Sequence, residues 1–245
     1  MVKVGKIELS LVLPAYNEAP RLEKCVEAVK RVLKGKKYEI IIAEDGSTDG
    51  TDKIAEKIAK TNKNIYHIHN DKKLGRGLAL KNAFSLCKGK ILAYLDVDMA
   101  TDINHLKELI KFAKENDVVT GSRYLPGSLT ERPILREFFS KVYNFLIRKL
   151  LGCKIFDSQC GFKAFSRKFF EEEIKNIHEK TWAWDTIVMV EAVKKGYKVK
   201  EFPVKWVEKK EFKTNVKRLI KDFIIHGKVI LKLFLKWRVG LNVKL

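Results

Sequence analysis

The first 120 residues alternate between short apolar runs and amphipathic stretches, and this alternation restricts the possible folds more than any other feature of the chain. The apolar runs have the length and β-branched content of strands, which we expect over residues 7–14, 38–45, 64–70, 90–96 and 117–124. The stretches between them carry apolar residues at helical spacing, which predicts helices over 21–35, 47–62, 75–89 and 103–116. Strands and helices in this order predict an α/β fold with a mostly parallel sheet flanked by helices.

The second half has a less regular pattern. Residues 131–151 predict an amphipathic helix whose broad apolar face consists of Leu135, Phe138, Phe139, Val142, Phe145, Leu146 and Leu150. We then expect a loop and strand over 157–165, a helix near 184–195 and a strand pair over 197–206. The tail, 212–238, predicts a basic amphipathic helix with apolar residues Leu219, Phe223, Ile230, Phe234 and Trp237. We therefore divide the chain into a main domain, 1–210, and a C-terminal helix, 211–245.

Composition narrows the setting in which the protein works. No apolar run reaches the roughly 18 residues of a spanning helix, and the N-terminal run is too short for a signal peptide. The four cysteines are scattered without metal-ligand spacing, which is typical of free thiols in a reducing compartment. We therefore expect a cytosolic protein, or one attached peripherally to the cytoplasmic face of a membrane.

A net charge of +20 indicates an anionic partner: nucleic acid, an acidic membrane or a phosphorylated substrate. The charge is concentrated at the end of the chain, where residues 205–245 hold 12 Lys and Arg against 3 Asp and Glu. A basic amphipathic helix in this region is typical of a helix lying on an anionic membrane. The alternative is a helix packed on its own domain or on a partner subunit.

Acidic side chains follow three of the predicted strands. Glu18 comes after the first strand, Glu44 and Asp45 end the second, and Asp96 and Asp98 end the fourth. The carboxyl ends of parallel strands meet at one edge of a sheet, where ligands bind. Asp96 and Asp98 point to the same side of an extended chain, and such oxygen ligands suit Mg²⁺ or Mn²⁺. The alternative is a pair of exposed loop aspartates that cap the helix beginning near Ile103.

A glycine-interrupted basic loop, "LGRGLALKNA", opens the third predicted helix. Gly75 and Gly77 allow close approach of the backbone, and Arg76 together with the helix N-terminus favours a phosphate. The loop lacks the spacing of a P-loop.

Six motifs in this order, "LVLPAYNE", "EDGSTDGT", "LGRGLALKNA", "LDVDMA", "GSRY" and "DSQCGFKAFSR", resemble family 2 glycosyltransferases with the GT-A fold. Over roughly residues 7–210 the chain is most similar to the polyprenyl-phosphate branch, the dolichyl-phosphate glucosyl- and mannosyltransferases. The segments "QCGFK" and "WAWD…FPVKW" look closer to the glucosyltransferases.

The resemblance implies a role for each matching residue. Asp96 and Asp98 would hold the metal on the diphosphate, although Met99 and Ala100 offer no third side-chain ligand. Arg123, Arg136 and Lys163 would bind the phosphate of the acceptor. Asp157, Gln159 and Lys163 would lie near the donor sugar and the acceptor. The nucleotide sugar would be bordered by Pro14, Ala15, Tyr16, Asn17, Glu18, Glu44, Asp45, Gly75, Arg76, Asp96 and Gln159.

These roles describe an inverting hexosyltransferase that uses UDP-glucose or, as the second choice, GDP-mannose. A phosphate acceptor is already anionic, so it hardly needs a general base, whereas a glycan hydroxyl acceptor would need one. Asp185 is the candidate for that base or for a donor-sugar contact, and the alternative is an N-cap of its helix. Membrane attachment would then depend on the helices over 131–151 and 212–238.

Two rival functions remain at this point. One is a soluble family 2 enzyme acting on a glycan hydroxyl, and the other is a non-enzymatic nucleic-acid-binding protein. The second rival is disfavoured because three acidic strand ends would repel phosphates, so no nucleic-acid partner is expected. A salt-dependent duplex-binding assay separates it from the enzyme.

Overall fold

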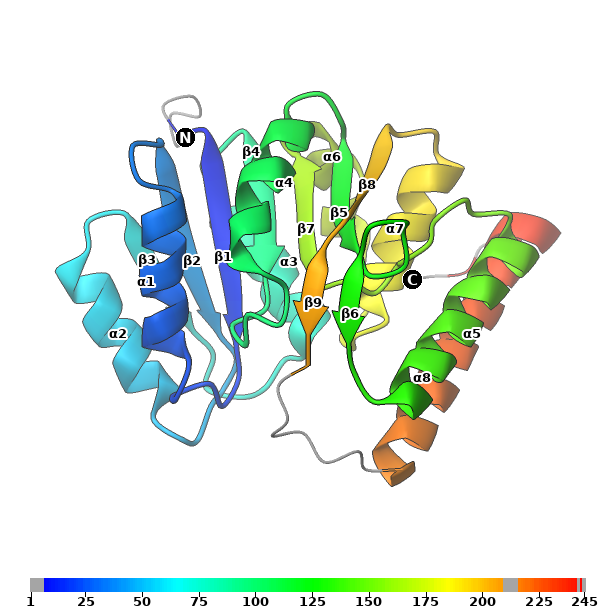
Figure 1. Cartoon of the computed structure of the whole chain (residues 1–245), viewed down its shortest axis with the longest axis horizontal. Coiled ribbons are helices and arrows are strands. Elements are labelled where there is room, and N and C mark those ends of the chain that lie inside the picture. Colours follow the sequence, from blue (N-terminus) through cyan, green and yellow to red (C-terminus); the bar gives the residue numbers. More distant parts are fainter. Residues whose placement is uncertain (1–6, 209–215, 242, 244–245) are drawn as a thin grey trace.

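The computed structural model describes residues 7–208, 216–241 and 243. Its centre is a seven-stranded sheet in the order β3-β2-β1-β4-β7-β5-β8 (Figure 1). These strands are β1 (Leu9–Ala15), β2 (Tyr38–Glu44), β3 (Ile65–His69), β4 (Ile91–Leu95), β5 (Val118–Ser122), β7 (Phe162–Ser166) and β8 (Val199–Pro203). Neighbouring strands are parallel except that β7 runs antiparallel to both β4 and β5. The predicted mostly parallel α/β fold is confirmed.

Helices cover both faces of this sheet (Figure 1). Side chains alternate along a strand, so Leu11 and Leu13 of β1 belong to one hydrophobic cluster and Val12 to the other. The first cluster contains side chains from α1 (Leu22–Val32), α2 (Thr51–Thr61) and α4 (Leu106–Ala113). The second contains side chains from α3 (Arg76–Leu86), α5 (Ile134–Leu151), α6 (Arg167–Glu172), α7 (Trp184–Lys194) and α8 (Val216–Phe234). Single turns over Ile103–His105, Ile174–Asn176 and Leu235–Val239 complete the helical part.

A second, two-stranded sheet lies beside the main one. It consists of β6 (Leu129–Glu131) and β9 (Lys205–Val207), which pair in parallel. The strand pair expected over 197–206 is therefore wrong in one respect, because β8 and β9 belong to different sheets. The chain leaves the main sheet after Pro203, buries Val204 and then pairs with β6.

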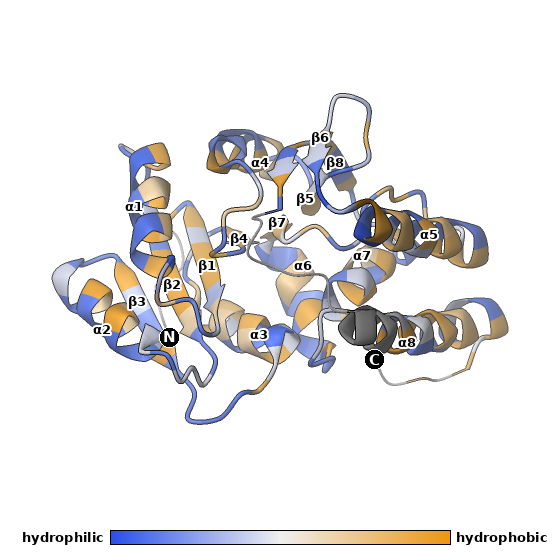
Figure 2. Ribbon diagram, turned by 60° about the horizontal axis from the view of Figure 1, so that its bottom comes forward, coloured by the Kyte–Doolittle hydropathy of each residue, from blue (hydrophilic) through white to orange (hydrophobic). Residues whose placement is uncertain are grey.

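The two long amphipathic helices, α5 and α8, lie side by side at one end of the molecule (Figure 1). Their apolar residues are arranged differently, although both helices contain many of them (Figure 2). In α5, Leu135, Phe138 and Phe145 of the predicted apolar face are exposed. In α8, Ile230 is buried and Phe234 packs against the core. Within the described ranges, no helix has both the length and the apolar character needed to cross a bilayer.

Part of the prediction for the C-terminal helix falls outside the described residues. This applies to its start at 212, to the domain boundary at 210, and to the side chains of Leu219 and Phe223.

Candidate active site

The carboxyl ends of β1, β2 and β4 open into a cavity of about 830 Å³. Most of the predicted site residues contribute to its lining, although they are widely separated in the sequence. Those residues are Pro14, Ala15, Tyr16, Asn17, Glu18, Asp45, Arg76, Asp96, Asp98, Arg123, Arg136, Gln159 and Asp185. We call residues 14–18 together with Asp45, Asp96 and Asp98 the strand-end wall. The sheet topology brings them together, as the strand pattern predicts.

The loop after β1 is bound to the loop after β2 by side-chain hydrogen bonds. The backbone N–H of Asn17 donates to Ser47 Oγ at 2.9 Å, and Asn17 Oδ1 accepts from the N–H of Thr48 at 2.9 Å. The N–H of Ala19 donates to Asp49 Oδ2 at 3.1 Å. Asn17 has a φ of 56°, a left-handed conformation that asparagine tolerates better than most residues. These bonds hold the two loops together as one unit.

Asp45 fixes a third loop to the same unit. Its Oδ1 accepts from the N–H of Leu74 at 2.8 Å, and its Oδ2 accepts from the N–H of Gly75 at 3.0 Å. Gly75 has a φ of 99°, and a Cβ at this position would overlap the carbonyl oxygen of Lys180. Gly75 does not line the cavity, so the expectation that it borders the nucleotide is corrected to a role in placing the loop.

Glu44 also departs from its predicted place. Its side chain is fully buried and lies outside the cavity lining. Oε2 lies 2.6 Å from His69 Nδ1, and Oε1 accepts from the N–H of Ser47. The expected contact between Glu44 and the nucleotide is therefore not supported by the geometry.

Asp96 and Asp98 both line the cavity at the end of β4. Asp96 Oδ1 lies 2.6 Å from Arg76 Nη1, and Asp98 Oδ1 accepts from the N–H of Ala100 at 3.0 Å. The pKa of Asp96 is raised to about 6, chiefly by burial; Arg76 opposes the rise, and the negative charges of Asp98 and Asp185 add to it. Gly161 leaves the space that Asp96 occupies, because a Cβ there would overlap its carboxylate.

This carboxylate pair fits a divalent cation. Both aspartates line one cavity, and a cation between them would offset the repulsion between the two carboxylates. The alternative, that the pair caps the helical turn at Ile103, is wrong. Asp102 is the N-cap of that turn, and its side chain accepts from the N–H of Asn104.

Arg76 and Asp185 form a buried charged group next to the carboxylate pair. The Arg76 guanidinium lies 4.3 Å from the ring centroid of Trp182 and 5.3 Å from that of Tyr94, with Asp185 Oδ2 at 3.6 Å from Nε. Asp185 Oδ1 accepts a hydrogen bond from the Tyr94 hydroxyl. The N-cap of α7 is Ala183 and makes no side-chain capping bond, so Asp185 is not the cap.

Lys163 lies beneath this group and does not reach the cavity. Its side chain is fully buried, its Nζ donates to the carbonyl of Cys160, and the same Nζ is 3.4 Å from Asp185 Oδ1. The expectation that Lys163 binds the acceptor phosphate is corrected, since its charge balances Asp185 inside the protein.

Arg123 forms an ion pair with a buried carboxylate of the protein. It forms a bidentate pair with the fully buried Asp157, with Nε–Oδ2 at 2.7 Å and Nη2–Oδ1 at 2.8 Å. A third bond joins the Arg123 N–H to Oδ2 at 3.0 Å. Burial opposes the charge of Arg123, but Asp157 outweighs it and raises the pKa. The guanidinium touches the cavity with its charge already neutralised.

A second set of residues has the opposite, basic character; the sequence predicted Arg136 among them but not the other three. We call Arg132, Arg136, Trp206 and Glu208 the arginine wall; all four line the cavity. Arg132 lies 5.1 Å from the Trp206 ring centroid and donates to Ser140 Oγ at 3.2 Å, while Arg136 pairs with Glu208. Burial, followed by the charge of Arg123, lowers the pKa of Arg132. Arg132 Nε also lies 3.7 Å from Glu208 Oε2, so two guanidinium groups share one carboxylate and the wall favours an added anion.

The helix α8 reaches the cavity through His226. Its ring centroid is 4.8 Å from that of Tyr143, and its Nε2 is 3.3 Å from Gln159 Nε2. The spacing of Arg132 four residues before Arg136 was a usable signal in the sequence. No local signal pointed to Trp206 or His226, because strand pairing and helix packing bring them in from far along the chain.

Comparisons with known proteins agree with this geometry. The model of glycosyl transferase family 2 matches residues 10–174. Glycosyltransferase AglD of Haloferax volcanii is 42% identical over 232 residues, which cover 92% of this chain and 37% of that protein. Dolichyl-phosphate beta-glucosyltransferase ALG5A of Trichomonas vaginalis is 33% identical over 229 residues, which cover 89% of this chain and 71% of that protein.

One solved structure shows the same fold at low sequence identity. It is glucosyl-3-phosphoglycerate synthase from Mycobacterium tuberculosis, in complex with Mn²⁺, UDP and glucosyl-3-phosphoglycerate. The TM-score is 0.68 at 17% identity, with 94% of this chain and 79% of that chain covered.

Proposed function

Because the chain belongs to the family 2 glycosyltransferases and has their GT-A fold, we propose that it transfers a hexose from a nucleotide sugar to dolichyl or polyprenyl phosphate at a membrane surface. One observation carries the proposal. A single cavity brings the carboxylates of Asp96 and Asp98 together with the guanidinium groups of Arg132 and Arg136. The first pair suits a metal-bound diphosphate, and the second suits a separate phosphate.

The donor would bind against the strand-end wall. Asp96 and Asp98 would hold Mg²⁺ or Mn²⁺, which neutralises the charge that develops on the departing nucleoside diphosphate. A related fold binds Mn²⁺ and UDP in the mycobacterial synthase, and the dolichyl-phosphate relative is named as a glucosyltransferase. UDP-glucose is therefore the first donor to test and GDP-mannose the second.

The acceptor phosphate would bind at the arginine wall. Its oxygen is anionic near neutral pH, so its attack on the anomeric carbon, from the face opposite the diphosphate, needs no general base. Repulsion between the two phosphate groups is the main obstacle, and Arg132 and Arg136 would offset it. A glycan hydroxyl acceptor has weaker support, because Asp185, the candidate base, is surrounded by Tyr94, Lys163 and Arg76.

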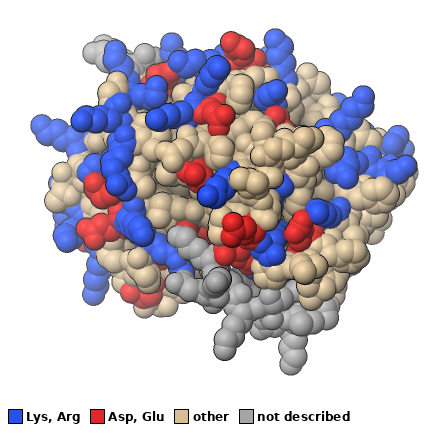
Figure 3. Space-filling model, in the orientation of Figure 1, with Lys and Arg blue, Asp and Glu red and all other residues tan. Residues whose placement is uncertain are grey.

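The exposed apolar face of α5 would rest on the membrane at the cytoplasmic face. Ile134 is 86% exposed and Phe138 59%, and the same helix carries Arg136 on the cavity side. On the side of the molecule seen in Figure 3, Lys and Arg side chains are mixed with Asp and Glu rather than gathered in one patch. Attachment would therefore combine apolar contact with a general attraction of the net positive charge to anionic lipid.

The test is donor binding followed by turnover. Calorimetric titration of UDP, GDP, UDP-glucose and GDP-mannose with Mn²⁺ present should show binding of one base, and Asp98→Ala should lose it. Hexose transfer to dolichyl phosphate in vesicles is then measured with that donor. Donor hydrolysis or transfer to a glycan hydroxyl, without transfer to the lipid phosphate, would overturn the acceptor assignment. Equal binding to Asp98→Ala would overturn the metal site.

A further inference from the structure

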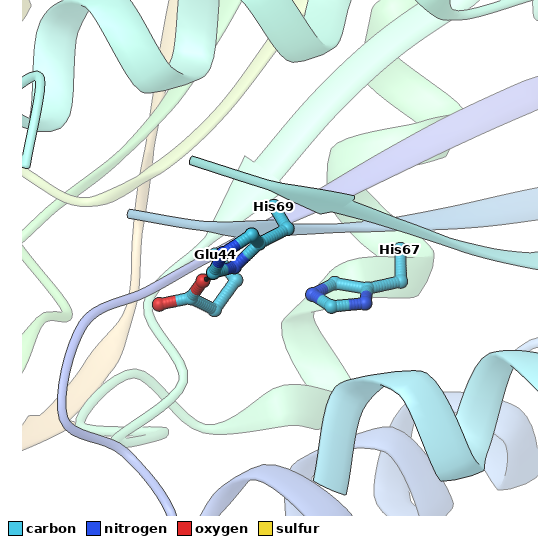
Figure 4. Close-up of side chains that lie close together, drawn as sticks. All are labelled: Glu44, His67 and His69. Atoms are coloured by element: carbon cyan, nitrogen blue, oxygen red, sulfur yellow. Dashed lines mark hydrogen bonds and ion pairs between the residues drawn. The ribbon is translucent and has the colours of Figure 1, made fainter. Parts of the chain in front are cut away.

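A second group of metal-ligating side chains lies away from the cavity, on the edge of the sheet. Glu44 of β2 is paired with His69 of the edge strand β3, and His67 lies two residues earlier on the same strand. Side chains two residues apart share one face of a strand, so all three project from the same side of the sheet. Figure 4 shows the three side chains close together, with the His69 ring beside the Glu44 carboxylate.

The spacing of the three groups suits a small cation. One ligand atom from each residue lies within 4.8 Å of those from the other two. Glu44 Oε2 and His69 Nδ1 are already 2.6 Å apart, and His67 Nε2 is buried with no hydrogen-bond partner. Ligand atoms about 2.0–2.1 Å from a tetrahedral Zn²⁺ lie roughly 3.4 Å apart, so small side-chain rotations would complete the site.

A carboxylate lies near the ring nitrogen of His69 that does not face Glu44. His69 Nε2 is 3.5 Å from Asp71 Oδ1, on the side opposite Glu44. A histidine that binds a metal through one ring nitrogen typically donates its other N–H to a carboxylate, which orients the ring. The His69 side chain is 45% exposed, so an ion can enter from solvent.

We propose that Glu44, His67 and His69 form a second divalent-metal site, which takes an imidazole-preferring ion such as Zn²⁺, Co²⁺ or Ni²⁺. This inference does not rest on the proposed transfer reaction. Two imidazoles and one carboxylate favour these ions, whereas the oxygen-only pair Asp96 and Asp98 favours Mg²⁺ or Mn²⁺. The two sites therefore select different metals.

Metal binding at this site would also restrict the motion of the strand-end wall, to which Glu44 is connected by hydrogen bonds. Glu44 also accepts a hydrogen bond from the N–H of Ser47, and Ser47 Oγ accepts from the N–H of Asn17 in the wall. An ion joining β2 to the edge strand would bind the folded chain only, and it would raise the unfolding temperature as its concentration rises.

The test is a Co²⁺ and Zn²⁺ titration of the tag-free full chain after treatment with a chelator. We expect a visible absorption band of imidazole-bound Co²⁺ that Zn²⁺ abolishes, and we expect it to persist in the double variant Asp96→Asn/Asp98→Asn. His67→Gln should weaken Zn²⁺ binding at least 10-fold and remove the Zn²⁺-dependent rise in unfolding temperature. His69→Gln, at a more exposed position, should do the same, and circular dichroism shows that each variant is folded.

His105→Gln is the matched control. His105 Nδ1 is also 2.6 Å from a carboxylate, that of Glu108, but in the described part of the chain this pair belongs to no three-ligand cluster. It should leave Co²⁺ and Zn²⁺ binding unchanged. The proposal is overturned if His67→Gln and His69→Gln bind Zn²⁺ like the unchanged protein, or if the double aspartate variant loses the band.

Discussion

The strand-end wall and the arginine wall face the same cavity, yet they are stabilised in different ways. In the strand-end wall, Asn17 and Asp45 bond to backbone N–H groups of neighbouring loops, so the protein itself fixes these loops. In the arginine wall, burial and the charge of Arg123 lower the pKa of Arg132. The loops of the first wall are held by the protein itself and only its Asp96 and Asp98 would gain from a cation, whereas the second wall gains from an anion.

This difference suggests a division of labour between two substrates. A preorganised wall can orient a nucleotide and its metal at little entropic cost. A wall with excess positive charge attracts a phosphate and releases it when that phosphate becomes esterified and less charged. Variants in the two walls should therefore affect different kinetic constants.

The largest effect is expected for Asp98→Asn in the strand-end wall. Loss of a metal ligand removes stabilisation of the departing diphosphate, and we expect kcat/KM to fall about 1,000-fold, or roughly 4 kcal/mol. Turnover measured with Mn²⁺ in excess checks the result.

Asp102→Asn is the control for this variant. Asp98 and Asp102 each accept the backbone N–H two residues ahead at 3.0 Å, so both changes disturb a similar turn. Only Asp98 lines the cavity. Equal losses in the two variants would mean that the turn, rather than a metal site, controls activity.

Arg123→Gln tests whether that guanidinium belongs to the arginine wall or to the framework. The change leaves the buried Asp157 carboxylate without its bidentate partner, which should lower the free energy of unfolding by about 3 kcal/mol. Urea denaturation measures this loss. A stable variant with a much higher KM for the lipid phosphate would instead place Arg123 in acceptor binding, as the sequence suggested.

Arg132→Gln should raise the KM for the lipid phosphate about 30-fold, or roughly 2 kcal/mol, because one charge-assisted hydrogen bond is lost. Donor affinity, measured by calorimetry, should not change. Arg148→Gln is the control, and it should leave this KM unchanged. Arg148 lies on α5 outside the cavity lining and donates to the carbonyl of Ile155. Weaker donor binding in Arg132→Gln would contradict the assignment of the donor to one wall and the acceptor to the other.

The strand-end wall could be predicted from the sequence because its information is local. An apolar run followed by Asp96 and Asp98 specifies a strand, its end and two side chains on one side of it. Glu44, by contrast, does not line the cavity where the nucleotide contact was expected, and the strand geometry explains why. It and Asp45 are consecutive, so they point to opposite sides, and only Asp45 lines the cavity.

The arginine wall depends on contacts between distant segments. The pairing of β9 with β6 brings Trp206 and Glu208 to the cavity. The two strands are separated by about 75 residues of sequence. The central antiparallel position of β7 has no local signature either, since a strand covered on both faces looks the same in either direction. Amphipathicity likewise predicted α5 and α8 equally, but it did not reveal which apolar face packs on the core.

The difference between these helices gives the smallest expected effect, on membrane binding. Phe138 of α5 is 59% exposed, whereas Ile230 of α8 is buried in the core. Phe138→Ser removes a side chain that would enter the membrane interface, and we expect about 5-fold weaker binding to anionic vesicles, or roughly 1 kcal/mol. Sedimentation with vesicles measures the change, while turnover of a water-soluble phosphate acceptor should stay the same.

Leu86→Ser provides the control for surface polarity, since Leu86 is 62% exposed on α3. If it reduces vesicle binding as much as Phe138→Ser does, attachment does not depend on the α5 face. If only Phe138→Ser reduces vesicle binding, then α5, which carries Arg136 of the arginine wall, also faces the bilayer. The acceptor's phosphate would then meet the arginine wall directly from the lipid surface, with no need to leave the membrane before it reacts.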